Sequence, residues 1–208
     1  MEWAAIAERA RVRYERAGTD VLRGNVAYAT GLALLMAGRT DETRAWFEKA
    51  ASGWRKSWAD ATPTSWGRPI GVIKALLLAG DDKGAADAAE WALSLGSADA
   101  ESPIGRYAAT LALLTLGRFD EARVQASSLR ERDDFPRDVA DALAFIAAHD
   151  IVAYADAAES VLTSFETRDE YLEAMAVADT LLVLQVLAAR RGIAADLPES
   201  PVLPAGAA

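Results

Sequence analysis

The sequence predicts an all-α protein, a solenoid of about five antiparallel helical hairpins with about ten helices in one domain over residues 1–208. Three observations support this fold class. Alanine, leucine and other helix formers dominate the chain, and runs of β-branched residues typical of strands are absent. Glycine or proline interrupts the chain roughly every 15 to 20 residues. A glycine-centred pattern also recurs along the middle of the chain, and the 52% hydrophobic content is enough for a substantial core.

The N-terminal part of the chain has clear helix boundaries. Residues 1–18 are predicted to form a capping helix that ends at a glycine. Thr19 or Asp20 has the short polar side chain that caps a second helix, which ends before Gly38. We therefore expect the hairpins to occupy residues 19–165.

Glycine, proline and capping residues also set the boundaries of the following helices. The segment 59–69 is predicted to be a loop, because the residues before Pro63 and Pro69 disfavour helix. Ser102 places a capping hydroxyl before Pro103, which takes the first helical position. The other helices are expected at about residues 41–58, 70–79, 82–95, 103–116 and 120–130. The next one starts at residues 134–136, and after a turn or kink at residues 149–150 another continues to residue 165.

A long last helix is predicted over residues 166–192. Thr167 and Glu170 have the spacing of a capping box, and Gly192 follows the last apolar residues as a stop. The tail, residues 193–208, contains three prolines and cannot be helical throughout. The apolar surface of this helix is expected either to be covered by the tail or to form a homodimer interface.

Three hairpins share one pattern of glycine and small residues. Gly38, Gly80 and Gly117 each separate an apolar helix from a more polar one. Small or apolar residues follow each glycine after five, nine and twelve positions: Thr43, Phe47, Ala50, Ala85, Ala89, Ala92, Ala122, Ala126 and Leu129. The pattern resembles the tetratricopeptide repeat (TPR), which has glycine at the turn and small residues where two helices touch. The resemblance implies a right-handed, TPR-like solenoid in which each hairpin buries its apolar face on its neighbours.

The net charge of -9 is concentrated in one part of the chain. Residues 99–179 hold 17 acidic and 7 basic side chains, whereas residues 1–98 are nearly balanced. Such a charge distribution repels nucleic acids and attracts basic partners. The alternative is a surface that only keeps the protein soluble. We expect another protein as the partner, and neither nucleic acid nor membrane.

Two acidic clusters are located at predicted helix starts. If both lie on the same edge of the solenoid, they form one negative surface that binds a basic partner. The alternative is that they only stabilise the N-terminal ends of their helices through the helix dipole. The candidate partner-binding residues are Asp133, Asp134, Asp138, Asp141, Glu166, Asp169, Glu170 and Glu173.

A tryptophan-rich segment suggests a ligand pocket as the alternative function. Trp54, Trp58 and Trp66 occur close together, and Arg68 follows shortly after. Trp54 and Trp58 are four residues apart and share a helix face. Aromatic rings beside a cation suit an anionic or aromatic ligand, as in a small-molecule-binding or regulatory protein. The alternative is that the rings fill the seam between wide hairpins.

Residues for catalysis or metal binding are scarce. The chain has one histidine, His149, and no cysteine, which excludes His-rich and thiolate metal sites. His149 is expected at a helix end, where it interacts favourably with the helix dipole. No glycine-rich phosphate-binding loop with a lysine occurs. We therefore predict a protein that is not an enzyme and that uses no cofactor and no metal.

One acid has an unusual environment. Asp179 is the single acid within the apolar stretch of the last predicted helix. A partly buried aspartate usually has a fixed partner. We expect Arg106 or Arg137 to be that partner.

The distribution of apolar and charged residues indicates the cellular compartment of the protein. The N-terminal stretch has charges scattered through it and no unbroken apolar core, so no signal peptide is expected. No apolar run approaches the roughly 18 to 20 residues that span a membrane. These features predict a cytoplasmic protein.

The C-terminal residues carry a further resemblance. The segments Arg191–Ile193, Glu199–Pro201 and Leu203–Pro204 resemble the end of the Imm49-type immunity proteins of bacterial polymorphic toxin systems. That family often has an aromatic residue where this chain has Val202. The resemblance implies a non-catalytic protein that binds and neutralises a cognate toxin. The acidic surface would then face a basic surface of the toxin.

Overall fold

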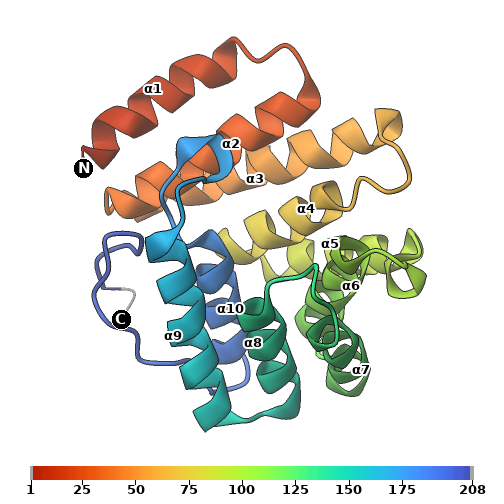
Figure 1. Cartoon of the computed structure of the whole chain (residues 1–208). Helices are drawn as coiled ribbons and strands as arrows, with labels where there is room; N and C mark the ends of the chain where they lie inside the picture. The colour runs from red at the N-terminus through yellow and green to blue at the C-terminus, as the bar shows by residue number, and fades with distance from the viewer. Residues whose placement is uncertain (1, 207–208) are drawn as a thin grey trace.

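Consecutive helices of the chain fold back on one another through short turns (Figure 1). The computed structural model describes residues 2–206, and this part contains ten α-helices, three short 3₁₀ turns and no strand. The all-α prediction is therefore confirmed. The helices are α1 (Trp3–Glu15), α2 (Asp20–Met36), α3 (Thr40–Ser57), α4 (Gly67–Leu78), α5 (Asp82–Ser94), α6 (Pro103–Thr115), α7 (Phe119–Arg130), α8 (Arg137–Ala148), α9 (Ile151–Thr167) and α10 (Asp179–Ala189).

The packing follows the order of the helices in the sequence. Each helix from α1 to α9 packs on the next one, and α4, α6 and α8 also contact one another in turn. The last helix, α10, packs against α4, α8 and α9 (Figure 1). These contacts are consistent with stacked hairpins, while the TPR-like handedness stays a prediction.

The three predicted turn glycines end α2, α4 and α6. Gly38, Gly80 and Gly117 have φ of 71°, 65° and 71°, in the left-handed region where glycine costs least. The residue after each glycine donates its N–H to the carbonyl five positions back, as Arg118 does to Leu113 at 2.9 Å. The small residues that follow these glycines are buried where the helices meet. The sequence pattern therefore identifies both the turns and the helix contacts correctly.

His149 ends α8 in the same way as the glycines. Its φ is 60°, and Asp150 donates its N–H to the Phe145 carbonyl at 3.0 Å. The imidazole Nε2 lies 3.1 Å from the carbonyl oxygen of Arg191, at the end of α10. The expected position at a helix end is confirmed, and the ring also ties the end of α8 to the end of α10.

The long last helix predicted over residues 166–192 is wrong at its N-terminal end. Thr167 is the last residue of α9 and does not cap a new helix, and α10 begins at Asp179. Residues 168–178, which we call the crossover segment, are mostly non-helical. Glu173 and Ala174 have positive φ of 53° and 58°, which a helix does not allow.

Tertiary contacts explain why the crossover segment leaves the helix. Met175 and Val177 are buried, and the N–H of Ala178 donates to the Val202 carbonyl at 2.9 Å. The carboxylate of Glu173 pairs with Arg13 of α1, and part of the segment contacts α2 (Figure 1). These contacts with distant parts of the chain outweigh the local capping signal.

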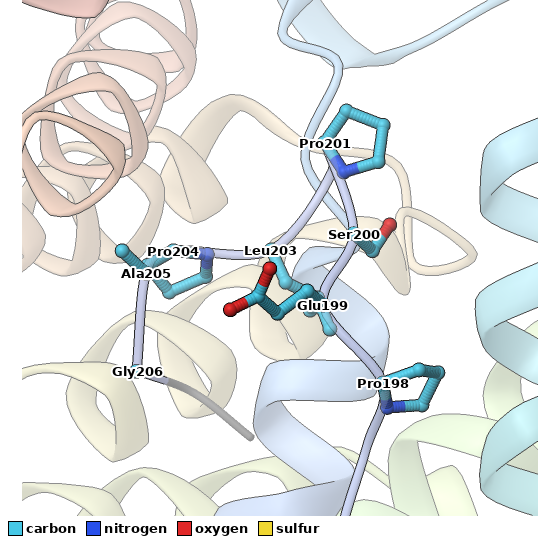
Figure 2. A pocket seen from close by; sticks show the side chains of 8 residues that line it. All are labelled: Pro198, Glu199, Ser200, Pro201, Leu203, Pro204, Ala205 and Gly206. Carbon is cyan, nitrogen blue, oxygen red and sulfur yellow. The ribbon is translucent and has the colours of Figure 1, made fainter.

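The C-terminal tail packs on the helices. Leu197, Val202 and Leu203 are buried, and Gln185 of α10 holds the tail through two hydrogen bonds to the backbone of Ala195. The tail curls around a cavity of about 440 Å³, and all the residues that line it lie between Pro198 and Gly206 (Figure 2). Of the two alternatives for the apolar surface of α10, coverage within the chain is confirmed.

Candidate functional site

Trp54 lies in a slot between α2 and α4. A Cβ atom at Gly24 of α2 would lie 2.6 Å from Cδ1 of the indole, and one at Gly71 of α4 would lie 2.6 Å from its Cε3. Glycine at both positions therefore lets the two helices approach opposite sides of the ring system. The indole Nε1 donates to Oδ1 of Asn25 at 2.8 Å, and Trp54 is 5% exposed.

Beyond Trp54, residues of both α2 and α4 line the space between the two helices. Because α3 packs between them in the hairpin order, α2 and α4 run in the same direction (Figure 1). The residues that line this space therefore follow one another in the same order on both helices, at three levels along the helix axes. From the outer end to the inner end they are Val21, Asn25 and Tyr28 on α2 and Arg68, Gly71 and Lys74 on α4.

A cavity of about 420 Å³ lies along these levels. We call it the α2–α4 cavity. Leu172 of the crossover segment covers part of it and is 50% exposed. The lining residues are mostly apolar or small, with a few polar groups among them: Val21, Asn25, Tyr28, Trp54, Ser65, Gly67, Arg68, Ile70, Gly71, Lys74, Leu172 and Asp179.

An ion pair forms the inner end of the α2–α4 cavity. Lys74 Nζ lies 2.5 Å from Oδ2 of Asp179 and also donates to Oγ1 of Thr180 at 3.1 Å. The hydroxyl of Tyr28 donates to the same carboxylate oxygen at 3.0 Å. The Lys74 and Asp179 side chains are only 12% and 16% exposed. Groups this sheltered need such partners, because an unpaired buried charge is costly.

The expected partner of Asp179 is wrong. Arg106 donates to the Ala100 carbonyl and Arg137 pairs with Asp141, whereas Lys74 and Tyr28 hold Asp179. The reason lies in tertiary packing, since α10 begins at Asp179 and lies against α4.

The phenols near this ion pair stay neutral. Burial, followed by the Asp179 charge, raises the pKa of Tyr28 well above its ordinary value. The same two causes raise the pKa of Tyr107, which is buried on α6. Tyr28 therefore keeps its proton and remains a hydrogen-bond donor to Asp179.

A second cavity of about 450 Å³ continues beyond the ion pair. It lies between Phe165 at the end of α9, Tyr171 and Met175 of the crossover segment, and α10. Lys74, Asp179 and Leu172 line both cavities. The ion pair therefore stands at the junction of two adjoining spaces.

The structure separates the residues of the predicted tryptophan pocket. Trp54 and Arg68 line the α2–α4 cavity, whereas Trp58 and Trp66 do not. Trp66 is 7% exposed and tilts against Trp58, which in turn meets Trp91 edge-on with ring centroids 5.8 Å apart. These rings fill the seam between hairpins, as the alternative interpretation expected.

The polar residues Asn25, Tyr28 and Lys74 are among the cavity residues that the sequence did not single out. A signal for one of them was present, because Lys74 is the single charge in the apolar stretch from Pro69 to Ala79. Asp179 has the corresponding position in its own apolar stretch. Two isolated opposite charges in apolar helices are natural partners, since each needs the other to be buried.

Arginines of the same chain pair with several of the candidate partner-binding acids. Asp134 accepts from Arg132 at 2.7 Å, which lowers its pKa. Asp141 lies 2.5 Å from Arg130 and 3.1 Å from Arg137. Glu173 pairs with Arg13, as described above. These contacts reduce the negative charge that the surface offers to a partner.

The remaining candidate acids are more weakly engaged. Glu166 accepts a hydrogen bond from Ser200 at 2.6 Å, and Asp138 accepts from the Val139 N–H at 2.9 Å. Asp133, Asp169 and Glu170 are exposed. Residues 133–141 lie around the start of α8 and residues 166–173 around the end of α9, so both groups are at the same end of this antiparallel hairpin (Figure 1). Within residues 2–206 no group of three or more His, Asp or Glu side chains could hold a metal ion.

Comparisons of the chain with protein-family models, with curated proteins and with solved structures found no match. The resemblances to the TPR and to the Imm49-type immunity proteins therefore stay predictions. In the described part of the chain, every helix is too short or too polar to cross a membrane. The candidate site is accordingly interpreted from its own geometry.

Proposed function

We propose that this protein binds a small, largely apolar molecule in the α2–α4 cavity. The observation that carries the proposal is the combination of apolar walls with a sheltered ion pair at one end. Val21, Ile70 and Leu172 supply aliphatic surface, and Trp54 supplies aromatic surface. Concave apolar sites with a few placed polar groups are typical of ligand-binding proteins, and about 420 Å³ is within their usual range.

Two glycines of the cavity lining differ in the space beside them. Gly67 begins α4 on the cavity wall, and a Cβ atom added there would meet no atom within 4 Å. The space beside Gly67 is therefore open, unlike the space beside Gly71, which the Trp54 ring occupies. Gly67 is exposed, so a larger side chain at this position can extend over the cavity lining without a clash.

A filling substitution tests the proposal. Gly67→Leu should occupy the open space and weaken the binding of a naphthalene-based fluorescent probe by roughly tenfold or more, because apolar contact area is lost. Gly18→Leu is the matched control, because Gly18 also has open space at its Cβ position and does not line the cavity. Probe titrations followed by fluorescence would measure both. Equal affinity of the two variants, or no binding by the unmodified chain, would contradict the proposal.

The hypothesis of a protein partner, most specifically a cognate toxin, stays a prediction. Its support is the acidic side of the α8–α9 hairpin, where Asp133, Asp169 and Glu170 are exposed. The internal ion pairs of Asp134, Asp141 and Glu173 weaken that support, and for this reason the cavity is the preferred site.

A further inference from the structure

We infer that the ligand of the α2–α4 cavity carries one carboxylate, or an equally compact anionic group, bound at the outer end by Arg68 and Asn25. Its apolar, preferably aromatic body lies along Ile70 and the Trp54–Gly71 wall, and its far end meets the Lys74–Asp179 pair. This inference rests on the proposed binding function and names the chemical class of the ligand.

Arg68 supplies hydrogen-bond donors at the outer end. Its Nη1 donates to the Ser57 carbonyl, which anchors the guanidinium beside the loop before α4. A guanidinium has five N–H donors in a planar fork, so this one bond leaves donors for a ligand. The fork matches the two oxygens of a carboxylate, and such paired bonds are among the strong ones.

Asn25 supplies donors at the middle level. An indole N–H can only donate, so the bond from Trp54 Nε1 fixes the amide oxygen of Asn25 toward the ring. The amide nitrogen then points its two N–H groups away from the indole. Asn25 lines the same cavity as Arg68. Two neighbouring levels therefore present donors rather than acceptors.

The charge balance of the lining also favours an anion. Arg68 and Lys74 are its two cations, and Asp179 is its one anion. Lys74 and Tyr28 both bond to Oδ2 of Asp179, so this carboxylate is already compensated. Arg68 has only a neutral carbonyl as its bonded partner among the described residues. One negative charge on the ligand would compensate it.

The spacing along α4 limits the length of the ligand. Arg68 and Lys74 are six residues apart, which corresponds to about 9 Å along a helix. One or two fused rings fill such a distance once the reach of the side chains is subtracted. Between them the Trp54 ring packs on Gly71, so the wall that a flat body would meet is aromatic.

Three probes of the same shape and different charge test the inference: 2-naphthoate, 2-naphthamide and 2-naphthylmethylammonium. Calorimetric titration of the full chain should show naphthoate binding at least about tenfold more tightly than naphthamide, because only the acid forms charge-assisted bonds with Arg68. The preference should decrease as salt increases. Arg68→Gln should abolish the preference, because naphthoate loses its charge-assisted bonds whereas naphthamide loses only neutral ones and weakens much less. Arg44→Gln is the control, because Arg44 is exposed on α3 and pairs with Glu48.

Asn25→Asp provides a second variant in case Arg68→Gln does not fold. It keeps the acceptor for Trp54 Nε1 and replaces the amide donors by a negative charge. Naphthoate should then lose at least tenfold in affinity, while the ammonium probe gains. Equal binding of acid and amide by the unmodified chain, or tightest binding of the ammonium probe, would overturn the inference and leave the proposed function standing. Binding of none of the three probes would overturn both.

Discussion

At the scale of single residues, the central feature is the group around Asp179. Its carboxylate has two partners from distant parts of the sequence, Lys74 and Tyr28, and all three lie where α2, α4 and α10 meet. For a largely buried ion pair, the main effect on stability is the cost of removing one partner, because the other charge then stays buried without compensation. The group also defines the inner end of the cavity, so stability and ligand binding depend on the same atoms.

A double-mutant cycle on the ion pair should be strongly non-additive. Lys74→Met leaves the Asp179 charge without its cation and should lower the free energy of unfolding by about 2 kcal/mol, less than for a fully buried pair because both side chains keep some exposure. Asp179→Asn should cost a similar amount. The double variant should be closer to the unmodified protein than the sum of the two, as urea unfolding would show. Additive losses would mean that the pair contributes no coupling.

The buried phenols should resist ionisation at alkaline pH. The folded-state pKa values of Tyr28 and Tyr107 lie above the ordinary value of 10.0, so above that pH the unfolded chain binds fewer protons than the folded one. Their contribution to stability is therefore complete below pH 10 and declines as the pH rises further. Tyrosinate absorbance should show these two phenols ionising only on unfolding. Tyr28→Phe should reduce the amplitude of that late phase, and an unchanged amplitude would contradict the assignment.

At the scale of elements, a residue in the left-handed conformation follows six of the ten helices in the described residues 2–206. Glycine supplies it after α2, α4, α5, α6 and α10, at positions 38, 80, 96, 117 and 192, and His149 supplies it after α8. A residue with a side chain is strained in this conformation, and glycine is not. The turn is therefore where a single substitution acts most directly on a hairpin.

Substitution of a turn glycine should cost more than substitution of an ordinary one. Gly117→Ala places a Cβ atom at a φ of 71° and should lower the free energy of unfolding by about 1 kcal/mol. Gly18→Ala, at a position without positive φ and with open space around its Cβ, should change it by less than about 0.5 kcal/mol. Conversely, His149→Gly should stabilise the protein slightly. Chemical denaturation of the three variants checks the series, and a Gly117→Ala variant as stable as Gly18→Ala would contradict it.

At the scale of the whole molecule, the crossover segment and the C-terminal tail pack back on the helices. The crossover segment reaches back to α1 and α2, and the tail folds over α10 (Figure 1). Leu197, Val202 and Leu203 are each less than 10% exposed, so the tail belongs to the core. This arrangement leaves α10 covered within one chain.

Removal of the apolar anchors of the tail should expose α10. The triple substitution of Leu197, Val202 and Leu203 by serine should lower the free energy of unfolding by roughly 3 kcal/mol or more, since each buried aliphatic side chain contributes about 1.5 kcal/mol or more. It should also promote self-association, because a new apolar patch appears. Substitution of the exposed Pro198 and Pro201 by serine is the control. Sedimentation and urea unfolding give the two results, and a stable triple variant would show that the tail is dispensable.

Local sequence signals were reliable where the structure depends on local physics. The glycines at positions 38, 80 and 117 predict turns because their conformation is set within a few residues. The small or apolar residues that follow them predict the helix contacts because their helical spacing places them on one buried face. The same kind of signal failed at Thr167, where burial of Met175 and Val177 and the pairing of Glu173 with Arg13 outweighed a capping box.

For the candidate site, the sequence by itself determined which residue types were available, and the tertiary structure decided which of them meet. An all-helical chain with turn glycines, clustered tryptophans and isolated charges at Lys74 and Asp179 can be read directly from the sequence. Only packing brings Lys74 to Asp179, which is 105 residues away in the sequence. Packing also places Trp54 in the cavity without Trp58 and Trp66, and it pairs surface acids with arginines of the same chain. The physical reason is range. Helix propensity and turn geometry act over a few residues, whereas a cavity and a buried ion pair depend on contacts between helices that are distant in the sequence.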